Sequence, residues 1–374
     1  MLISVDMYNK FKLVGFKLGI LLFLFVMSMR LFSAGLACTN TYDHNFIIFD
    51  NGKIVYQDHN AAKKYWVGHN YIAFIDYMNT LRVYHDGHAR EITLGISDIE
   101  ADDSLFIWFV AGTLKVWNQG EVQLINRNVS FFKLNEGAIV YFDVLNRTLN
   151  VWYDNKSFFL DENHLDFPLT ALQVSRKTVA WQTPEFQFKL FFDGVVLSKH
   201  IYEENLKFAT CELCCAMNNP TNQEFEMLKP NGYFTLETSE AKWWKSKYKQ
   251  FVFLNRYDDL KIVFNDETLN IGNHMPEFVA LTQHGLFYDR AGQIYYFENN
   301  SERYVIDYIP TFIHVFERFF VYRNSAGYIQ VWDNGTEFEP SITKTASVEV
   351  MTNVLIIKEA TKTSFWFNGK EYSI

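Results

Sequence analysis

The sequence LRVYHDG at residues 81–87 decides the fold, because it is one copy of a phrase that recurs along the chain. Other clear copies read IQVWDNG at 329–335 and LNVWYDN at 149–155. Nine copies occur between residues 70 and 369, at a spacing close to 35 residues. A fixed period of this length predicts an array of repeated supersecondary units.

Each copy is expected to be the second strand of a β-hairpin. A short run of aromatic and β-branched residues precedes it, as in YIAFID at 71–76, and a polar loop separates the two. The copy ends in Asp-Gly, Asn-Gly or Asp-Asn, residues that tolerate positive φ values and favour tight hairpin turns. Such short segments exclude the helical repeats that share this period.

A unit of this length accommodates four strands. Strands of ~5–6 residues with connections of ~3 need about 34 residues for four strands and about 26 for three. The remaining strands are recognisable in EITL at 91–94 and in LQVS at 172–175, and we expect the second of these at the outer edge. A partial copy, FIIFDNG at 46–52, begins the array, so one unit is predicted to be built from both chain ends.

Tandem four-stranded antiparallel sheets resemble the blades of a β-propeller. The resemblance covers residues 40–374 and implies an all-β fold of about eight to ten blades, in a single domain at 38–374. It stops at the superfamily, since only VWD at 331–333 is similar to a subfamily signature. Two smaller propellers or a β-solenoid are the alternatives.

Residues 1–37 are predicted to be a secretory signal peptide. Three lysines precede an apolar run at 18–29, and small residues follow it at 33–37. The run has 12 residues, whereas a membrane span needs about 20. We therefore expect an exported protein in the periplasm, with outer-membrane association or an extracellular location as alternatives.

The chain has only four cysteines, too few for a disulfide-stapled scaffold. Cys211, Cys214 and Cys215 fall in a predicted strand, where Cys211 and Cys214 would lie ~10 Å apart, too far for a disulfide or a shared metal. They are expected in the core, and we expect no metal or other cofactor. Cys38 follows the predicted cleavage site and leaves a lipid anchor open, although Gly35 stands where a lipobox has Leu.

Acidic and amide residues recur where the loop after the first strand of each hairpin begins. Because the units repeat, these side chains should circle one face and form a partly acidic rim for a basic partner surface or a cation. The alternative is that each one caps its own turn. The residues are Asp76, Asp143, Gln182, Asn255, Asp289 and Asn324, with Asp258, Asp259 and Glu359 beside them.

The segment KWWKSKYK at 242–249 interleaves cations with aromatic rings. Trp243, Trp244, Lys245 and Lys247 are therefore candidates to grip a partner peptide or a sugar through cation–π and stacking contacts. The alternative is that the tryptophans pack between units and the lysines are solvated.

The formal net charge of −9 argues against a nucleic-acid partner. No nucleophile elbow, phosphate-binding loop or dinucleotide fingerprint occurs, so we expect a protein without catalytic activity. In kind it resembles periplasmic propellers that serve as accessory subunits of outer-membrane assembly or secretion machines, and its composition resembles that of Bacteroidota proteins. The resemblance implies a binding scaffold with a protein partner in the cell envelope. A carbohydrate-binding or carbohydrate-active propeller is the alternative.

Overall fold

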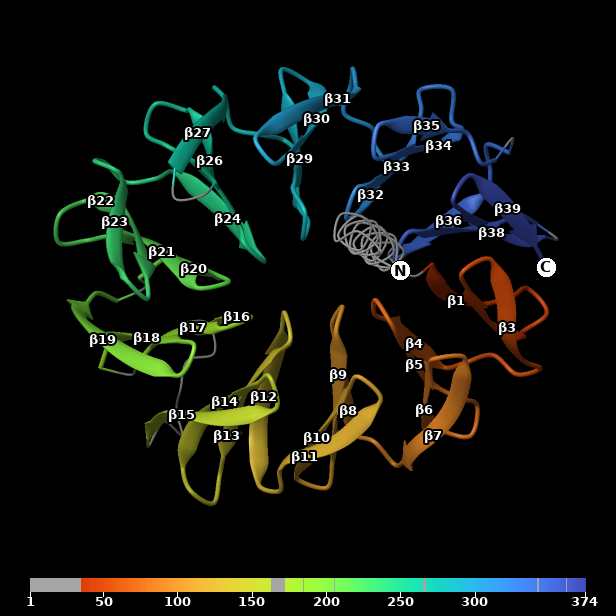
Figure 1. Ribbon diagram of the computed structural model, residues 1–374, viewed down its shortest axis with the longest axis horizontal. Coiled ribbons are helices and arrows are strands. Elements are labelled where there is room, and N and C mark those ends of the chain that lie inside the picture. Colours follow the sequence, from red (N-terminus) through yellow and green to blue (C-terminus); the bar gives the residue numbers. More distant parts are fainter. Residues whose placement is uncertain are drawn as a thin grey trace, which may run out of the picture.

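The computed structural model describes residues 35–162, 172–183, 185–204, 206–264, 267–341, 343–360 and 362–374. Their strands form ten antiparallel sheets arranged around one ring, which confirms the predicted β-propeller over two smaller rings or a solenoid (Figure 1). Within these ranges no helix has the length and apolar character to cross a membrane. Residues 1–34 of the predicted signal peptide lie outside the described residues, so the boundary after residue 37 stays a prediction.

We number the blades 1 to 10 in chain order and call their strands A to D from the centre of the ring outward (Figure 1). The A strands are β4 (Lys64–Val67), β8 (Asp98–Ala101), β12 (Val129–Asn135), β16 (Leu172–Ser175), β20 (Phe208–Cys211), β24 (Trp243–Lys247), β28 (Val279–Leu281), β32 (Ile313–Phe316) and β36 (Ser347–Met351). The expectation that residues 172–175 lie at the outer edge is wrong, because β16 is an innermost strand.

The middle of each blade is formed by the B and C strands, which carry the repeated phrase. The B strands are β1 (Leu36–Asn40), β5 (Ile72–Ile75), β9 (Leu105–Val110), β13 (Ala138–Asp143), β17 (Thr178–Gln182), β21 (Cys214–Asn219), β25 (Gln250–Leu254), β29 (Leu286–Arg290), β33 (Phe319–Arg323) and β37 (Val354–Lys358). The C strands are β2 (Phe46–Asp50), β6 (Thr80–His85), β10 (Thr113–Asn118), β14 (Thr148–Tyr153), β18 (Gln187–Phe192), β22 (Glu224–Lys229), β26 (Leu260–Phe264), β30 (Gln293–Glu298), β34 (Ile329–Asp333) and β38 (Thr363–Phe367).

The outer wall consists of the D strands, which are the most exposed. They are β3 (Lys53–Asp58), β7 (His88–Leu94), β11 (Glu121–Asn126), β15 (Lys156–Glu162), β19 (Val195–Tyr202), β23 (Gly232–Glu237), β27 (Glu267–Gly272), β31 (Ser301–Ile306), β35 (Thr336–Phe338) and β39 (Lys370–Ser373). Many C–D hairpins close through the predicted turn residues, as at Asp86 and Gly87, whose φ angles are 48° and 82°.

The core lies between the blades, since the B and C strands bury side chains on both faces. In β10, Val116 packs with Ile139 and Trp152 of the following blade. The next residue, Trp117, packs with Tyr71 of the preceding blade. Successive side chains of a strand point to opposite faces, so one run of apolar residues joins each blade to both neighbours.

The ring closes by packing between its first and last blades. The prediction of one unit built from both chain ends is wrong, because within the described residues β1–β3 form one sheet and β36–β39 another. Phe49 of β2 stacks on Phe365 of β38 with ring centroids 4.8 Å apart. The Thr352 hydroxyl donates a hydrogen bond of 2.8 Å to the Leu36 carbonyl. Among the described residues, apolar packing between the three-stranded sheet β1–β3 and the four-stranded sheet β36–β39 therefore closes the circle without a shared strand.

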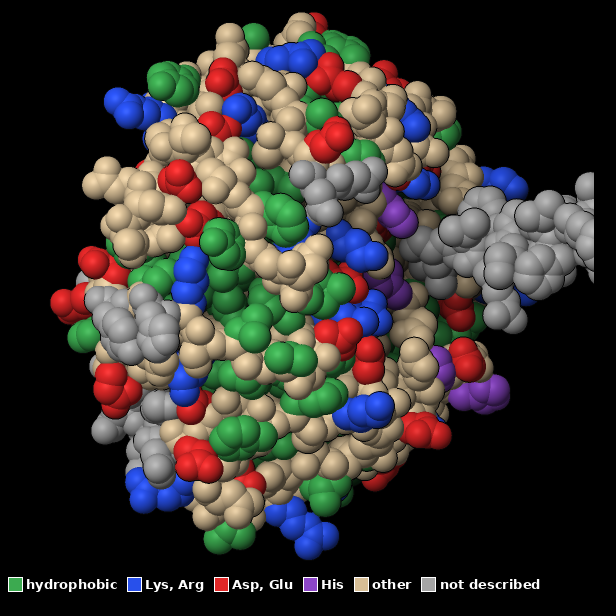
Figure 2. All heavy atoms as spheres, turned by 60° about the vertical axis from the view of Figure 1, so that its left-hand side comes forward, with side chains coloured by type: hydrophobic (Ala, Val, Ile, Leu, Met, Phe, Trp, Pro, Cys, Tyr) green, Lys and Arg blue, Asp and Glu red, His purple; other side chains and the backbone are tan. Residues whose placement is uncertain are grey.

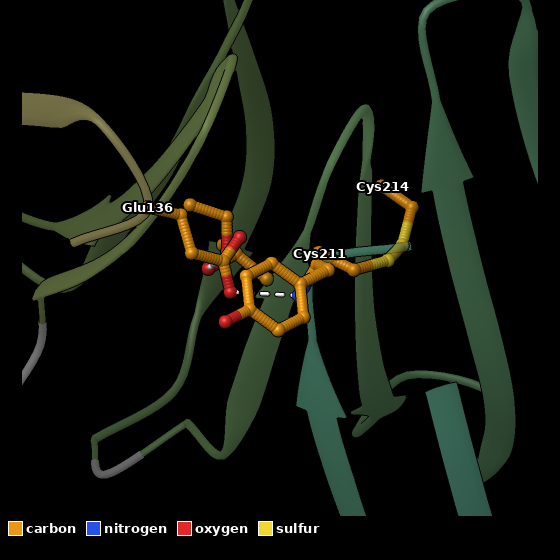
Figure 3. Close-up of a disulfide and its surroundings, with 6 residues drawn as sticks. Glu136, Cys211 and Cys214 are labelled. Carbon is orange, nitrogen blue, oxygen red and sulfur yellow. Dashed lines mark hydrogen bonds between the residues drawn. A yellow bond between two sulfur atoms is a disulfide. The ribbon is translucent and has the colours of Figure 1, made fainter. Parts of the chain in front are cut away.

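The cysteines lie in the core as expected, but the prediction that Cys211 and Cys214 cannot pair is wrong. β20 ends at Cys211 and β21 begins at Cys214, so the chain reverses between them and their Cα atoms are 5.0 Å apart. A disulfide joins the two (Figure 3). The spacing argument assumed one straight strand, whereas Leu213, with a φ of 60°, belongs to a tight turn. Cys215 is free and buried, as is Cys38 in β1, where burial raises the pKa of the thiol.

Candidate functional site

Each A strand runs beside the axis of the ring, so the A–B turns meet around that axis. The turns of blades 2 to 8 line a single cavity of about 510 Å³, from His69 in blade 2 to His284 in blade 8. Because neighbouring strands are antiparallel, the A–B and C–D turns share one face of the ring, and the B–C turns lie on the opposite face. We call the first the axial face and its cavity the axial cavity.

Tyr248 in the A–B turn of blade 7 crosses the axial cavity and links four blades. Its hydroxyl donates a hydrogen bond to Asp103 of blade 3. Its amide donates a bond of 2.7 Å to Glu136 of blade 4, and its carbonyl accepts a bond of 2.7 Å from the Glu212 amide of blade 6. Figure 3 shows Glu136 directed toward this turn, near the disulfide, with its hydrogen bond dashed. Burial and the Asp103 carboxylate raise the pKa of Tyr248.

Glu317 in the A–B turn of blade 9 ties two more blades together through histidines. Its carboxylate oxygens lie 3.9 Å from Nε2 of His69 and 3.6 Å from Nε2 of His284. The nearby Glu317 carboxylate raises the pKa of His69 against the opposing effect of burial. In the part of the chain that the structure describes, no three His, Cys, Asp or Glu side chains are placed to hold a metal ion.

The other carboxylates at the cavity also have partners within the protein. Asp102 accepts hydrogen bonds from the amides of Ser104 and Leu105, and a third of 2.5 Å from the Gly137 amide of the next blade. Glu136 is largely buried, and that burial raises the pKa of its carboxyl. These acids therefore fix the turns against one another.

The cations at the cavity are more loosely held. Lys247 places its ammonium 4.7 Å from the ring centroid of Tyr248. Lys249 lies 3.9 Å from Glu212 with its side chain 75% exposed. Arg176 lies 3.8 Å from Asp154, and both side chains are more than half exposed.

A second cavity of about 550 Å³ adjoins the axial cavity. The two share Glu212, Lys249, Gln283 and His284 in their linings. The disulfide of blade 6 lines the second cavity, so it lies within the same face. The axial face thus carries one continuous depression across blades 2 to 9 and is the candidate site.

The acids predicted to form a rim lie on the opposite face, inside their own B–C turns. Asp76, Asp143 and Asp289 are each at most 5% exposed. Asp76 accepts hydrogen bonds from the Met78 and Thr80 amides and from Arg82. Burial opposes ionisation there, but these donors together lower the pKa of Asp76.

The same turn chemistry recurs in the other blades. Asp143 accepts bonds from Asn126 and Asn146, and Asp289 from the Phe278 amide, with His274 within hydrogen-bonding distance of it. Asn255 accepts bonds from the Tyr257 and Asp259 amides. Asp259 in turn accepts a bond from the Asn255 amide group, and half-exposed Asp258 pairs with Lys242. These contacts fit the alternative that each residue caps its own turn. Binding of a partner by these residues stays a prediction.

The lysine–tryptophan segment divides between the core and the axial cavity. Trp243 packs against the core between blades 7 and 8, and Trp244 packs against Phe225 of blade 6. Lys245 donates a hydrogen bond to the Val279 carbonyl of blade 8. Lys247 alone of the four candidates lines the axial cavity.

Sequence reasoning singled out the segment 242–249, which contains Tyr248, without naming that tyrosine as a candidate. It missed the other residues that build this site: Asp103, Glu136, Arg176, His284 and Glu317. Their common signal is the register, since each stands in the turn just before a B strand. Their side chains differ in every blade, so no repeated phrase marks them. Only the closure of the ring shows that these turns meet.

A strip of apolar side chains marks one side of the outer wall (Figure 2). It includes Val195, Val196 and Leu197 of β19 and Tyr233 and Phe234 of β23, which are between 38% and 69% exposed. Lys199 and Lys229 lie 5.5 Å from the ring centroids of Tyr233 and Phe234. This wall lies away from the axial cavity and has no part in its lining.

Comparison with known proteins places the whole ring in one family. Residues 31–372 match the model of the 10-bladed beta propeller domain, whereas no curated protein matches the chain. Similar solved structures include AztD from Citrobacter koseri, at 9% identity over 90% of this chain and 93% of that one, with a TM-score of 0.35. The computationally designed Ika8 protein is 14% identical over 81% and 94%, with a TM-score of 0.34.

PorZ of Porphyromonas gingivalis, described as an essential bacterial surface component of the type-IX secretion system, is similar at 7% identity. The likeness covers 90% of this chain and 58% of PorZ, with a TM-score of 0.27. Likenesses this distant do not indicate what the present chain binds. The match over residues 31–372 and the ten sheets of the ring agree, and the chain belongs to the 10-bladed beta propeller domain family.

Proposed function

We propose that this protein is an exported, non-catalytic scaffold that binds a protein partner of the cell envelope through its axial face. The observation that carries the proposal is the meeting of seven A–B turns around one open cavity. A rigid scaffold that displays loops from many elements is the usual basis of a binding surface. Here the blades supply the rigidity and the turns supply the variable side chains.

The cross-ring contacts support binding by a preformed surface. Tyr248 and Glu317 together connect the turns of blades 2, 3, 4, 6, 7, 8 and 9. Turns held in this way lose little conformational entropy when a partner docks, which favours affinity.

The cysteine chemistry supports export. The Cys211–Cys214 disulfide would persist in an oxidising compartment such as the periplasm, whereas cytosolic thiols are kept reduced. It agrees with the signal peptide predicted at residues 1–37. We propose the periplasm as the location and an envelope or outer-membrane protein as the partner.

The test is capture of the tagged full-length protein from envelope extracts of its own organism, followed by mass spectrometry. Gln283→Trp places a bulky ring in the wall shared by both cavities, and exposed Gln57→Trp on β3 is the matched control. We expect one stoichiometric partner with the wild type and the control, and its loss with Gln283→Trp. A partner retained in full by Gln283→Trp would contradict docking at the axial face.

One observation favours the carbohydrate-active alternative. Asp103 and Glu136 line the same cavity and both bond to Tyr248, while burial raises the pKa of Glu136 as a general acid requires. Release of reducing ends from an envelope polysaccharide, abolished by Glu136→Gln, would establish this function in place of the scaffold. If the wild type releases no reducing ends, the carbohydrate-active alternative is excluded.

A further inference from the structure

The charges at the axial cavity are not equally available to a ligand. Three of its four carboxylates accept hydrogen bonds within the protein: Asp102 from three amides, Asp103 from the Tyr248 hydroxyl and Glu136 from the Tyr248 amide. The fourth, Glu212, lies 3.9 Å from Lys249. Glu317, just behind the lining, faces His69 and His284. Acidic side chains therefore outline the cavity but offer few free oxygens to it.

The cations at the cavity, in contrast, are exposed and only weakly paired. Arg176 and Lys249 stand 3.8 and 3.9 Å from their acidic partners and are 53% and 75% exposed, the geometry of weak, water-screened pairs. Lys247 lies over the Tyr248 ring, and among the described residues no carboxylate comes within ion-pair distance of it. Three positive groups from the turns of blades 5 and 7 thus remain free to hold an anion.

The positive charges on blade 7 lie close enough to influence one another. Lys245, two residues before Lys247, has its pKa lowered by burial and by the Lys247 charge. Figure 2 shows Lys and Arg side chains beside His, Asp and Glu side chains where the outer wall meets the face of the ring, at the right of the view. Four carboxylates line the axial cavity against three cations, so the cations differ from the acids in exposure and in weak pairing and not in number.

We propose that the axial cavity binds an acidic peptide segment of the partner, whose carboxylates are held by Arg176, Lys247 and Lys249. The inference rests on the proposed function and names the chemistry of its partner. The adjoining cavities of about 510 and 550 Å³ have more volume than a single phosphate ion fills. Gln283, His69 and His284 supply further hydrogen-bonding groups of the kind that a peptide backbone uses.

The test is fluorescence anisotropy of the full-length protein with a short labelled peptide rich in Asp and Glu, against the same peptide carrying Asn and Gln. The axial variant is R176E/K247E/K249E. The matched control, K53E/K64E/K370E, makes the same charge change at exposed lysines of β3, β4 and β39. All six side chains are exposed, so both variants should keep the wild-type thermal midpoint, and R176Q/K247Q/K249Q provides a milder second variant.

We expect the acidic peptide to bind the wild type and the control, more weakly as salt rises, and the neutral peptide to bind far less. The axial variant should lose about tenfold or more in affinity, and the glutamine variant less than that. Equal affinity for the axial variant and the wild type would overturn the proposal. Binding of inorganic phosphate or of polygalacturonate without binding of the peptide would also overturn it. If a captured partner is lost with Gln283→Trp yet the acidic peptide does not bind, the scaffold stands and only this inference fails.

Discussion

At the scale of single residues, the hydroxyl of Tyr248 holds blade 7 to blade 3 across the axis. Tyr248→Phe removes that donor and leaves the Asp103 carboxylate without it, which should lower the free energy of unfolding by about 2 kcal/mol. Urea denaturation of the full-length protein measures the change. Tyr257→Phe is the control, since Tyr257 is 75% exposed and should tolerate the change. Equal stability of the Tyr248 variant and the wild type would show that the link does not support the ring.

The His69–Glu317 pair predicts a pH dependence. Glu317 raises the pKa of His69, with Asp103 contributing in the same direction. A histidine whose pKa is higher in the folded than in the unfolded protein stabilises the fold. This stabilisation is fully present at pH values below the unfolded-state pKa of about 6.5, and it is lost as pH rises through the folded-state pKa. His69→Gln should therefore cost about 0.5 kcal/mol at pH near 5.5 and less near pH 8.5, because the pair is partly exposed. A cost that is the same at both pH values would exclude this role.

At the scale of the element, the β20–β21 hairpin of blade 6 combines the disulfide with a support for Tyr248. The Glu212 amide between the two cysteines donates to the Tyr248 carbonyl. A disulfide that closes so short a loop should stabilise the fold by about 2 kcal/mol. Reductant should lower the thermal midpoint of the wild type but leave that of Cys211→Ser/Cys214→Ser unchanged. If reductant doubles the number of free thiols in the wild type but leaves its thermal midpoint unchanged, the disulfide does not stabilise the fold.

The same hairpin shows how far the sequence predicts these elements. The repeated phrase locates the C strands, from β6 to β38, because its apolar alternation and turn residues are imposed by burial between blades. The spacing of Cys211 and Cys214 led to the wrong prediction that they cannot pair, because a turn of only two residues lies between them. Nothing in the repeated phrase marks that turn. The turns that carry Asp103, Tyr248 and Glu317 are unpredictable one by one, since their positions depend on contacts between blades 3 and 7 and between blade 9 and blades 2 and 8.

At the scale of the whole molecule, the ring depends on the contact between blades 1 and 10. Phe49 is fully buried and meets the rings of Phe365, Phe367 and Tyr372. Phe49→Ala should lower the free energy of unfolding by about 3–5 kcal/mol while keeping one cooperative transition. Phe159→Ala, at a ring 53% exposed on β15, is the control and should cost far less. A separate early transition confined to blade 1 would mean that the blades do not unfold as one ring.

The central claim is that the protein engages its partner through the axial face. Photo-crosslinking in living cells tests it most directly, with a photoreactive residue placed singly at three exposed sites of the full-length protein: Gln283 at the axial cavity, Tyr257 on the opposite face and Tyr304 on the outer wall. The three positions carry the same probe and differ only in the face they report. We predict one discrete protein adduct from position 283 and none from 257 or 304. An adduct from 257 or 304 with none from 283 would contradict the account.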